Sequence, residues 1–132
     1  MKKWISMLLV SVAFVFVLVG CSQKTADPIV LPDIDKIETV EITTVGGSTV
    51  SYSDKEWIEQ FLSIFTQATA TSKQSVQDCP NVDKYGKVNI SNNGGITTVF
   101  YYAENGKYYI EQPYQGIYET DVDIDAFVSG IE

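Results

Sequence analysis

The 132-residue sequence contains no histidine and no arginine, and it has only 2 cysteines. Without histidine, the usual acid–base side chain at neutral pH is missing, and so are the Ser-His and Cys-His pairs that activate nucleophiles. Without arginine there is no guanidinium to clamp a phosphate, and the few lysines form no basic run that would neutralise a nucleic acid. We therefore expect a protein that is not an enzyme, holds no cofactor and does not bind nucleic acid.

Residues 1–20 have the layout of a secretory signal peptide. Lys2 and Lys3 precede an apolar run that ends at Gly20 and Cys21. The run is shorter than the roughly 20 residues that a permanent membrane-spanning helix needs, so a retained anchor helix is the less favoured alternative. The signal peptide predicts export across the cell membrane.

The four residues Leu-Val-Gly-Cys at positions 18–21 resemble the lipobox of bacterial lipoproteins. The resemblance implies cleavage before Cys21 and attachment of acyl chains such as palmitate to that cysteine. Two or three chains hold a protein stably at a bilayer. We expect a protein anchored in the cell membrane through the Cys21 lipid, on the extracytoplasmic face.

Composition places one domain after the anchor. Residues 21–32 are polar at first and contain two prolines, which is typical of a tether, and residues 33–132 form a single domain. The chain after the signal peptide has 7 lysines against 17 acidic residues, a formal charge of −10. Anionic surfaces would repel this domain. Lipidation consumes the thiol of Cys21, so Cys79 has no disulfide partner and is expected to be buried, as free cysteines usually are.

Hydrophobic periodicity predicts an α+β domain made of a β-hairpin, a helix, a three-stranded antiparallel meander and a short C-terminal helix. The sequence Ser53-Asp54-Lys55-Glu56 matches a capping box at the helix start, with Tyr52 and Trp57 in contact around it. The hydrophobic residues of positions 68–83 follow neither a helical nor a strand period, so this segment is expected to be an ordered connection. The predicted strands are residues 36–45, 48–52, 87–90, 96–102 and 108–112, and the helices are residues 57–65 and 121–131.

Two segments, TSKQSVQDCP at residues 71–80 and KYYIEQPYQGIY at residues 107–118, resemble a family of small uncharacterised lipoproteins from Firmicutes, which are Gram-positive bacteria. The resemblance extends from about Asp33 to the C-terminus. The family is a domain of unknown function, so it implies an exported lipoprotein and supplies no catalytic residues.

The last predicted hairpin and the turn after it concentrate tyrosines and polar side chains. Neighbouring residues on a strand point to opposite faces, so each Tyr-Tyr pair must place one ring outward, where it could stack on sugar or peptide. Cross-strand pairing within the hairpin is the structural alternative. The candidate binding residues are Tyr109, Glu111, Tyr114, Gln115 and Tyr118.

A weaker alternative is a calcium site near the C-terminus. The acidic side chains there follow the ligand spacing of a 12-residue calcium loop. Against it, Ala126 stands where the loop needs glycine, and the apolar spacing already fits a helix with acidic residues at its start. The residues concerned are Asp121, Asp123, Asp125 and Glu132.

The favoured hypothesis is a non-catalytic binding module of the cell envelope whose partner is an envelope protein or a wall component. Two alternatives stay open. One is a carboxylate-based cell-wall hydrolase, because 17 acidic residues can form a catalytic pair. The other is a sensor or inhibitor domain that regulates a membrane protein.

Overall fold

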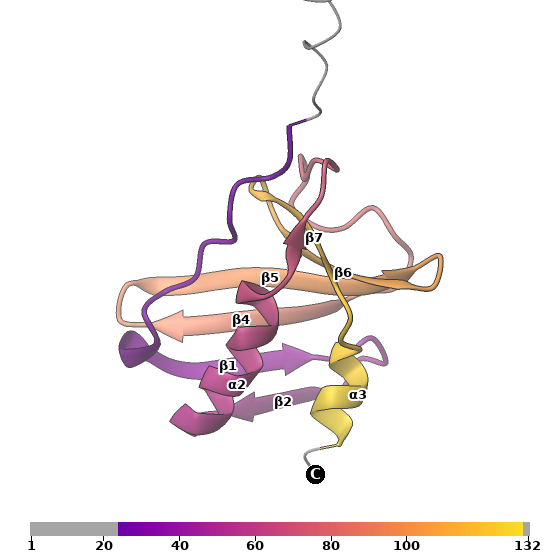
Figure 1. The fold of residues 1–132 in the computed structure, drawn as a ribbon. Coiled ribbons are helices and arrows are strands. Elements are labelled where there is room, and N and C mark those ends of the chain that lie inside the picture. Colours follow the sequence, from indigo (N-terminus) through magenta and orange to yellow (C-terminus); the bar gives the residue numbers. More distant parts are fainter. Residues whose placement is uncertain (1–23, 131–132) are drawn as a thin grey trace, which may run out of the picture.

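A seven-stranded antiparallel sheet forms the framework of the protein (Figure 1). The computed structural model describes residues 24–130, so the predicted signal peptide and Cys21 lie outside the described residues. Across the sheet the strands follow the order β2-β1-β4-β5-β6-β7-β3. The elements are η2 (Ile34–Lys36), β1 (Ile37–Thr43), β2 (Thr49–Tyr52), α2 (Lys55–Thr66), β3 (Thr69–Ala70), β4 (Gly86–Asn92), β5 (Gly95–Glu104), β6 (Lys107–Gln112), β7 (Gly116–Thr120) and α3 (Ile124–Ser129). The predicted α+β class is confirmed.

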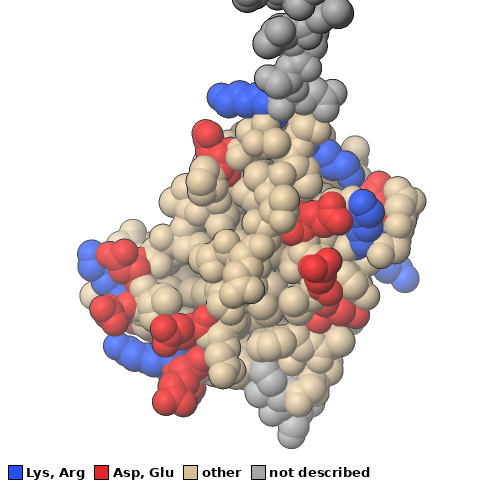
Figure 2. Space-filling view, viewed as in Figure 1, with Lys and Arg blue, Asp and Glu red and all other residues tan. Residues whose placement is uncertain are grey.

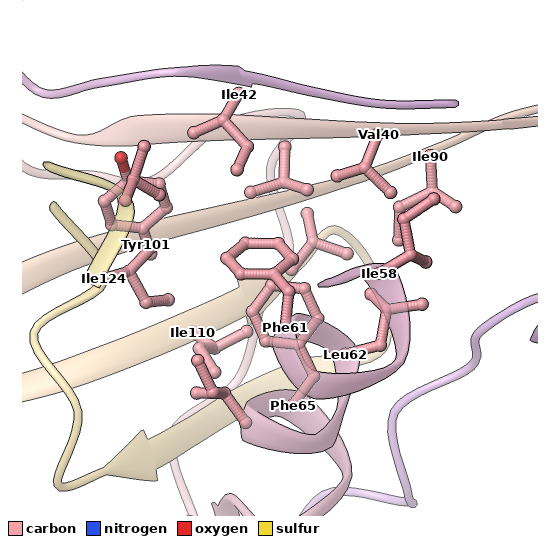
Figure 3. Close-up of a cluster of buried hydrophobic side chains, with 14 of the residues drawn as sticks. Val40, Ile42, Ile58, Phe61, Leu62, Phe65, Ile90, Tyr101, Ile110 and Ile124 are labelled. Carbon is pink, nitrogen blue, oxygen red and sulfur yellow. The ribbon is translucent and has the colours of Figure 1, made fainter. Parts of the chain in front are cut away.

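Helix α2 lies across one face of the sheet and supplies the centre of the core (Figures 1 and 3). Its apolar residues recur at helical spacing, so Phe61 and Phe65 project from one side and are almost fully buried. Facing them are the inward residues of β1, β4, β5 and β6, which alternate along each strand. Figure 3 shows Ile42, Val40, Ile90 and Ile110 directed toward these two rings.

The start of α2 differs from the predicted capping box. The N-cap is Asp54, whose side chain accepts a hydrogen bond from the Trp57 amide at 2.9 Å, so the prediction of Ser53 as the cap is wrong. Aspartate and serine cap helices about equally well, and shifting the cap by one residue brings the Trp57 amide within reach. The predicted contact between Tyr52 and Trp57 is confirmed, because their rings stack with centroids 3.5 Å apart.

Both predicted hairpins are present, and the sheet extends beyond them. The sequence prediction missed β3 and β7. The two-residue β3 lies in the segment predicted to be a connection, and it is a strand because it pairs with β7. Such a short pair has no periodicity of its own, so only the tertiary contact defines it. The C-terminal helix is present and begins after Asp123, which caps it through the Ala126 amide.

A second, smaller cluster covers the opposite face of β5, β6 and β7. Tyr102, Tyr109 and Ile117 form it, with Val82 and Tyr85 packed against them. Val82 and Tyr85 come from the segment between β3 and β4, so this segment covers the second face. The rings that the sequence placed outward are therefore largely buried as well.

Candidate functional site

The two tyrosines at the end of β5 point to opposite faces, as the strand geometry predicts. Tyr101 belongs to the main core and Tyr102 to the second cluster. Burial raises the pKa of Tyr101, and Asp125, which accepts a hydrogen bond from its hydroxyl at 2.5 Å, adds to the effect. Burial likewise raises the pKa of Tyr102, with a further contribution from Glu111. Both phenols thus stay protonated well above their usual range.

Two of the predicted binding residues, Tyr109 and Glu111, are buried beneath the segment between β3 and β4. The Ser75 hydroxyl donates to Glu111 Oε1 at 2.8 Å. The Lys73 Nζ lies 4.4 Å from the centroid of the Tyr109 ring, which is a cation–π contact. Glu111 and Tyr109 therefore hold the segment between β3 and β4 in place.

Two other predicted residues, Gln115 and Tyr118, contact the N-terminal segment, residues 24–31. Gln115 Nε2 donates to the Pro28 carbonyl at 2.9 Å, and the buried Tyr118 hydroxyl donates to the Asp27 carbonyl. Gln112, which is not among the five candidate residues, forms two hydrogen bonds to the same segment. Its signal in the sequence is its place at the end of a strand, within the run of polar side chains from Glu111 to Gln115.

The N-terminal segment is therefore a packed part of the domain. Ala26, Ile29 and Leu31 pack against the main core, and the Ala26 amide donates to the Thr71 carbonyl at 3.0 Å. The sequence predicts a tether over residues 21–32 and a domain that begins at Asp33. In the structure, residues 26–31 of the predicted tether pack against the domain.

The fifth predicted residue, Tyr114, is the exposed member of the set. Its side chain is 67% exposed, and its hydroxyl donates to Asp78 Oδ1 at 2.7 Å, a hydrogen bond that raises the pKa of Tyr114. The five residues thus lie in three different environments and do not line one open surface. Their role in binding a partner stays a prediction.

The structure instead brings aromatic and acidic side chains together in a pocket beside the start of α3. The pocket has a volume of about 310 Å³, and Tyr101 and Tyr108 line it together with Asp123 and Asp125. Most of its exposed wall is apolar, and carboxylate, hydroxyl and ammonium groups stand among the apolar parts, a combination found in small-molecule sites. The remaining lining residues are Val45, Lys84, Tyr102, Ala103, Tyr109, Thr120, Val122 and Ile124.

Hydrogen bonds fix both carboxylates of this pocket. Asp123 Oδ1 accepts from the Ala126 amide at 3.2 Å, and its Oδ2 accepts from the Tyr108 hydroxyl at 3.4 Å. Asp125 Oδ1 accepts from the Tyr101 hydroxyl and, at 3.4 Å, from the Val45 amide. The pocket therefore presents two acceptor groups in fixed positions to a ligand that donates hydrogen bonds.

A protein-family model matches most of the chain. The model of the DUF5301 family, described as "Domain of unknown function (DUF5300)", matches residues 25–119. The chain belongs to this family. The match begins at the N-terminal segment, in agreement with its packing against the core, and it ends before α3. Tyr101 and Tyr108 lie within the matched range of DUF5301, and Asp123 and Asp125 follow it.

A solved structure shares the DUF5301 fold seen here. It is the NMR structure of a protein from Ruminococcus gnavus, which is 43% identical and superimposes with a TM-score of 0.65. The alignment covers 76% of this chain and 95% of that one. No curated protein matches the chain.

In this DUF5301 member the C-terminal acidic residues are used as helix caps and acceptors. Asp123 begins α3 and Asp125 bonds Tyr101, so the backbone there is helical where a calcium loop would wind around its ion. Within residues 24–130 no group of three or more His, Cys, Asp or Glu side chains is placed to hold a metal ion. Glu132 lies outside the described residues.

Cys79 is exposed, so the prediction that it is buried is wrong. It lies in an irregular stretch of bends between β3 and β4, in which Val82 and Tyr85 pack against the second cluster while Cys79 points to solvent. The Cys79 thiol raises the pKa of the neighbouring Tyr85 hydroxyl. Across the described part of the chain, no helix combines the length and the apolar character that crossing a membrane requires.

Proposed function

We propose that the mature protein is a lipid-anchored, extracytoplasmic binding module that catalyses no reaction and holds an amine-bearing ligand of the cell envelope in the pocket beside α3. The anchor is supported by the signal peptide and by the Leu-Val-Gly-Cys sequence that ends at Cys21. The pocket is supported by its walls and by the side chains that converge on it.

The convergence of Asp123, Asp125, Tyr101 and Tyr108 on one cavity is the observation that carries the proposal. Carboxylates in fixed positions favour a cationic donor, and hydrogen bonds between charged groups are the stronger kind. An aromatic ring beside the same cation adds a cation–π attraction. A primary amine meets both requirements.

The rest of the pocket favours a peptide over a simple amine. Val45, Ala103 and Val122 offer apolar walls to the body of a ligand, and Lys84 lines the same pocket with a positive charge. A peptide carries an amine, an apolar side chain and a carboxylate. Wall peptides and exposed envelope proteins both supply this chemistry outside the membrane.

The carboxylates also suit binding better than hydrolysis. Each is committed as an acceptor to a helix cap or to a tyrosine hydroxyl, and the sequence holds no histidine to share protons with them. These contacts position both carboxylates as acceptors for a ligand. The hydrolase alternative predicts instead that the protein releases soluble fragments from cell walls.

The test is sedimentation of the purified mature protein, kept in detergent, with cell walls of the producing bacterium that have been stripped of membrane. The key variant is Asp123→Asn with Asp125→Asn, which removes both charges and keeps the cap and the acceptor, because asparagine caps as well as aspartate. Losing charge-assisted bonds worth about 1.5–3 kcal/mol each should lower the bound fraction at least tenfold. The matched control is Asp35→Asn, an exposed aspartate in η2 that does not line the pocket.

Equal retention of both variants would contradict the proposal. Release of soluble wall fragments by the parent protein, abolished in the double variant, would replace it with the hydrolase. The melting temperature of each variant shows that a loss of binding does not come from unfolding.

A further inference from the structure

The end of the molecule at which the N-terminal segment enters the domain carries two exposed apolar side chains. Val76 is 65% exposed and Tyr114 is 67% exposed. Both line one shallow depression, which Lys24 and Lys73 line as well. We call this set of four residues the tip.

Tyr114 has a strained backbone conformation in the turn between β6 and β7. Its φ is 61°, in the left-handed region that favours glycine. Its hydroxyl is bonded to Asp78, which holds the ring outward. Strained non-glycine residues of this kind cluster at sites that bind or switch.

Charge also separates the tip from the rest of the domain. The positive charges of Lys24 and Lys73 at the tip equal in number the negative charges of the neighbouring Asp27 and Asp78. The other described residues comprise 5 lysines and 14 acidic residues. In Figure 2, blue side chains lie beside the point where the grey N-terminal chain leaves, and most red side chains on this face lie farther away. The tip is the part of the surface that an anionic partner repels least.

The length of chain before the tip limits what can cover it. Cys21 precedes Lys24 by three positions, a distance that spans at most about 10 Å when fully extended. From Ala26 onward the segment is held to the domain by the Thr71, Gln112 and Tyr118 contacts. A lipid on Cys21 therefore keeps the tip within about 10 Å of the headgroups.

We infer that the tip rests on the anionic membrane surface, with Tyr114 and Val76 at the level of the headgroups, Lys24 bound to lipid phosphates, and Lys73 exchanging its contact with the Tyr109 ring for a phosphate. This inference rests on the proposed lipid anchor. Tyrosine is enriched at the membrane–water interface because its ring is apolar and its hydroxyl polar, and lysines near the surface bind anionic lipids.

This contact fixes the orientation of the protein. β6 and β7 run between the tip and the pocket, since their connecting loop carries Tyr114 while Tyr108 and Thr120 at their other ends line the pocket. Figure 1 shows β7 leading away from the N-terminal segment toward α3. With the tip on the bilayer, the pocket faces the cell wall.

The native Cys79 allows a direct test, because it is exposed, follows Asp78 at the tip and is the remaining thiol once Cys21 carries lipid. The lipoprotein is purified from membranes and labelled at Cys79 with a fluorophore. It is then reconstituted into phosphatidylglycerol vesicles that contain a headgroup-attached quencher. The matched control carries Cys79→Ser and Glu56→Cys, which moves the label to the exposed start of α2.

We expect several-fold stronger quenching at Cys79 than at position 56, and weaker quenching in phosphatidylcholine. Lys24→Gln should reduce the membrane-facing population about fivefold, since a lysine contributes about 1 kcal/mol near an anionic surface. Lys73→Gln should have a smaller effect, because Lys73 gives up its contact with the Tyr109 ring to reach a phosphate. Tyr114→Gly with Val76→Ser should reduce quenching without lowering the melting temperature, because glycine relieves the strained φ.

Equal quenching at the two label positions in a chain whose mass includes the lipid would overturn the orientation and leave the anchor intact. A mass spectrum without lipid on Cys21 would overturn the anchor and this inference with it. The pocket proposal is tested separately by its own variants.

Discussion

The side chain of Gln112 forms two hydrogen bonds with the backbone of Val30, 82 positions earlier in the chain. Its Nε2 donates to the Val30 carbonyl at 2.7 Å, and its Oε1 accepts from the Val30 amide at 2.8 Å. A carboxamide used in this way replaces a neighbouring strand, because it offers one donor and one acceptor to one residue. This pair is one of several contacts that attach the N-terminal segment to the domain, beside the hydrogen bonds at Thr71, Gln115 and Tyr118.

Replacing Gln112 by alanine should loosen the N-terminal segment around Val30. Two hydrogen bonds worth about 1 kcal/mol each are lost, so the free energy of unfolding should fall by about 2 kcal/mol. In a domain of this size the melting temperature should fall by roughly 8–16 °C. Thermal melts and hydrogen exchange at the Val30 amide measure the two effects. Gln115→Ala, which removes one exposed bond, is the control with a smaller expected loss.

Gly116 should not tolerate a side chain. A Cβ at this position would lie 2.3 Å from the Ala26 Cβ, well inside van der Waals contact. Gly116→Ala should therefore destabilise the domain by about 1–3 kcal/mol, as overpacking usually does. Adding Ala26→Gly removes the opposing atom and should restore much of the loss in a urea titration. Failure of this second change to rescue the first would mean that the segment does not pack as described.

Because Asp54 is the helix cap, substitutions of Asp54 and of Ser53 should change the free energy of unfolding differently. Asp54→Ala should destabilise the protein by about 1 kcal/mol, and Asp54→Asn should cost little because asparagine caps equally well. Ser53→Ala should have almost no effect, since Asp54 accepts from the Trp57 amide. Chemical denaturation of the three variants checks the order. A larger loss at Ser53 would restore the capping box that the sequence suggested.

Alkaline pH should unfold the protein through its buried tyrosines. Burial, aided by Asp125 and Glu111, raises the pKa of Tyr101 and Tyr102 above the value of about 10 in the unfolded chain. Above about pH 10 the folded state therefore binds more protons than the unfolded state. The free energy of unfolding keeps its full value below that pH and falls as the pH rises further. Each group should contribute about 1.4 kcal/mol per pH unit.

Urea titrations at a series of pH values above about 10 measure the slope. Tyr102→Phe should make it shallower, because phenylalanine has no proton to lose. An unfolding free energy that stays constant over this range would show that the two hydroxyls ionise normally in the folded protein.

Local patterns predicted most of the fold. The alternation in Ile37–Thr43 and Gly95–Glu104 and the turns at Asn92–Gly95 and Asn105–Gly106 act over a few residues, so the hairpins were visible in the sequence. β3 was not visible, because two residues become a strand only by pairing with Tyr118 and Glu119. The packing of residues 26–31 was missed for the same reason, since Gln112 and Val30 are far apart in the chain.

The candidate site was predictable only in part. The Tyr-rich hairpin was identified, but which rings stay open depends on the segment that covers Tyr109 and Ile117, and no local pattern reveals this cover. Asp123 and Asp125 were recognised as helix-start residues. Their contacts with Tyr108 and Tyr101 join the end of the chain to β5 and β6, and this tertiary contact creates the pocket.

The most direct test of the central claim is an NMR titration of the mature protein with soluble, amine-bearing wall peptides from the producing bacterium. The same peptides with acetylated amines are the control. We predict saturable shifts confined to the residues around Tyr101, Tyr108 and Thr120, which disappear with acetylated peptides and in the variant with Asp123→Asn and Asp125→Asn. Shifts that are absent, that lie elsewhere on the domain, or that are identical for free and acetylated peptides would contradict a pocket built for an amine.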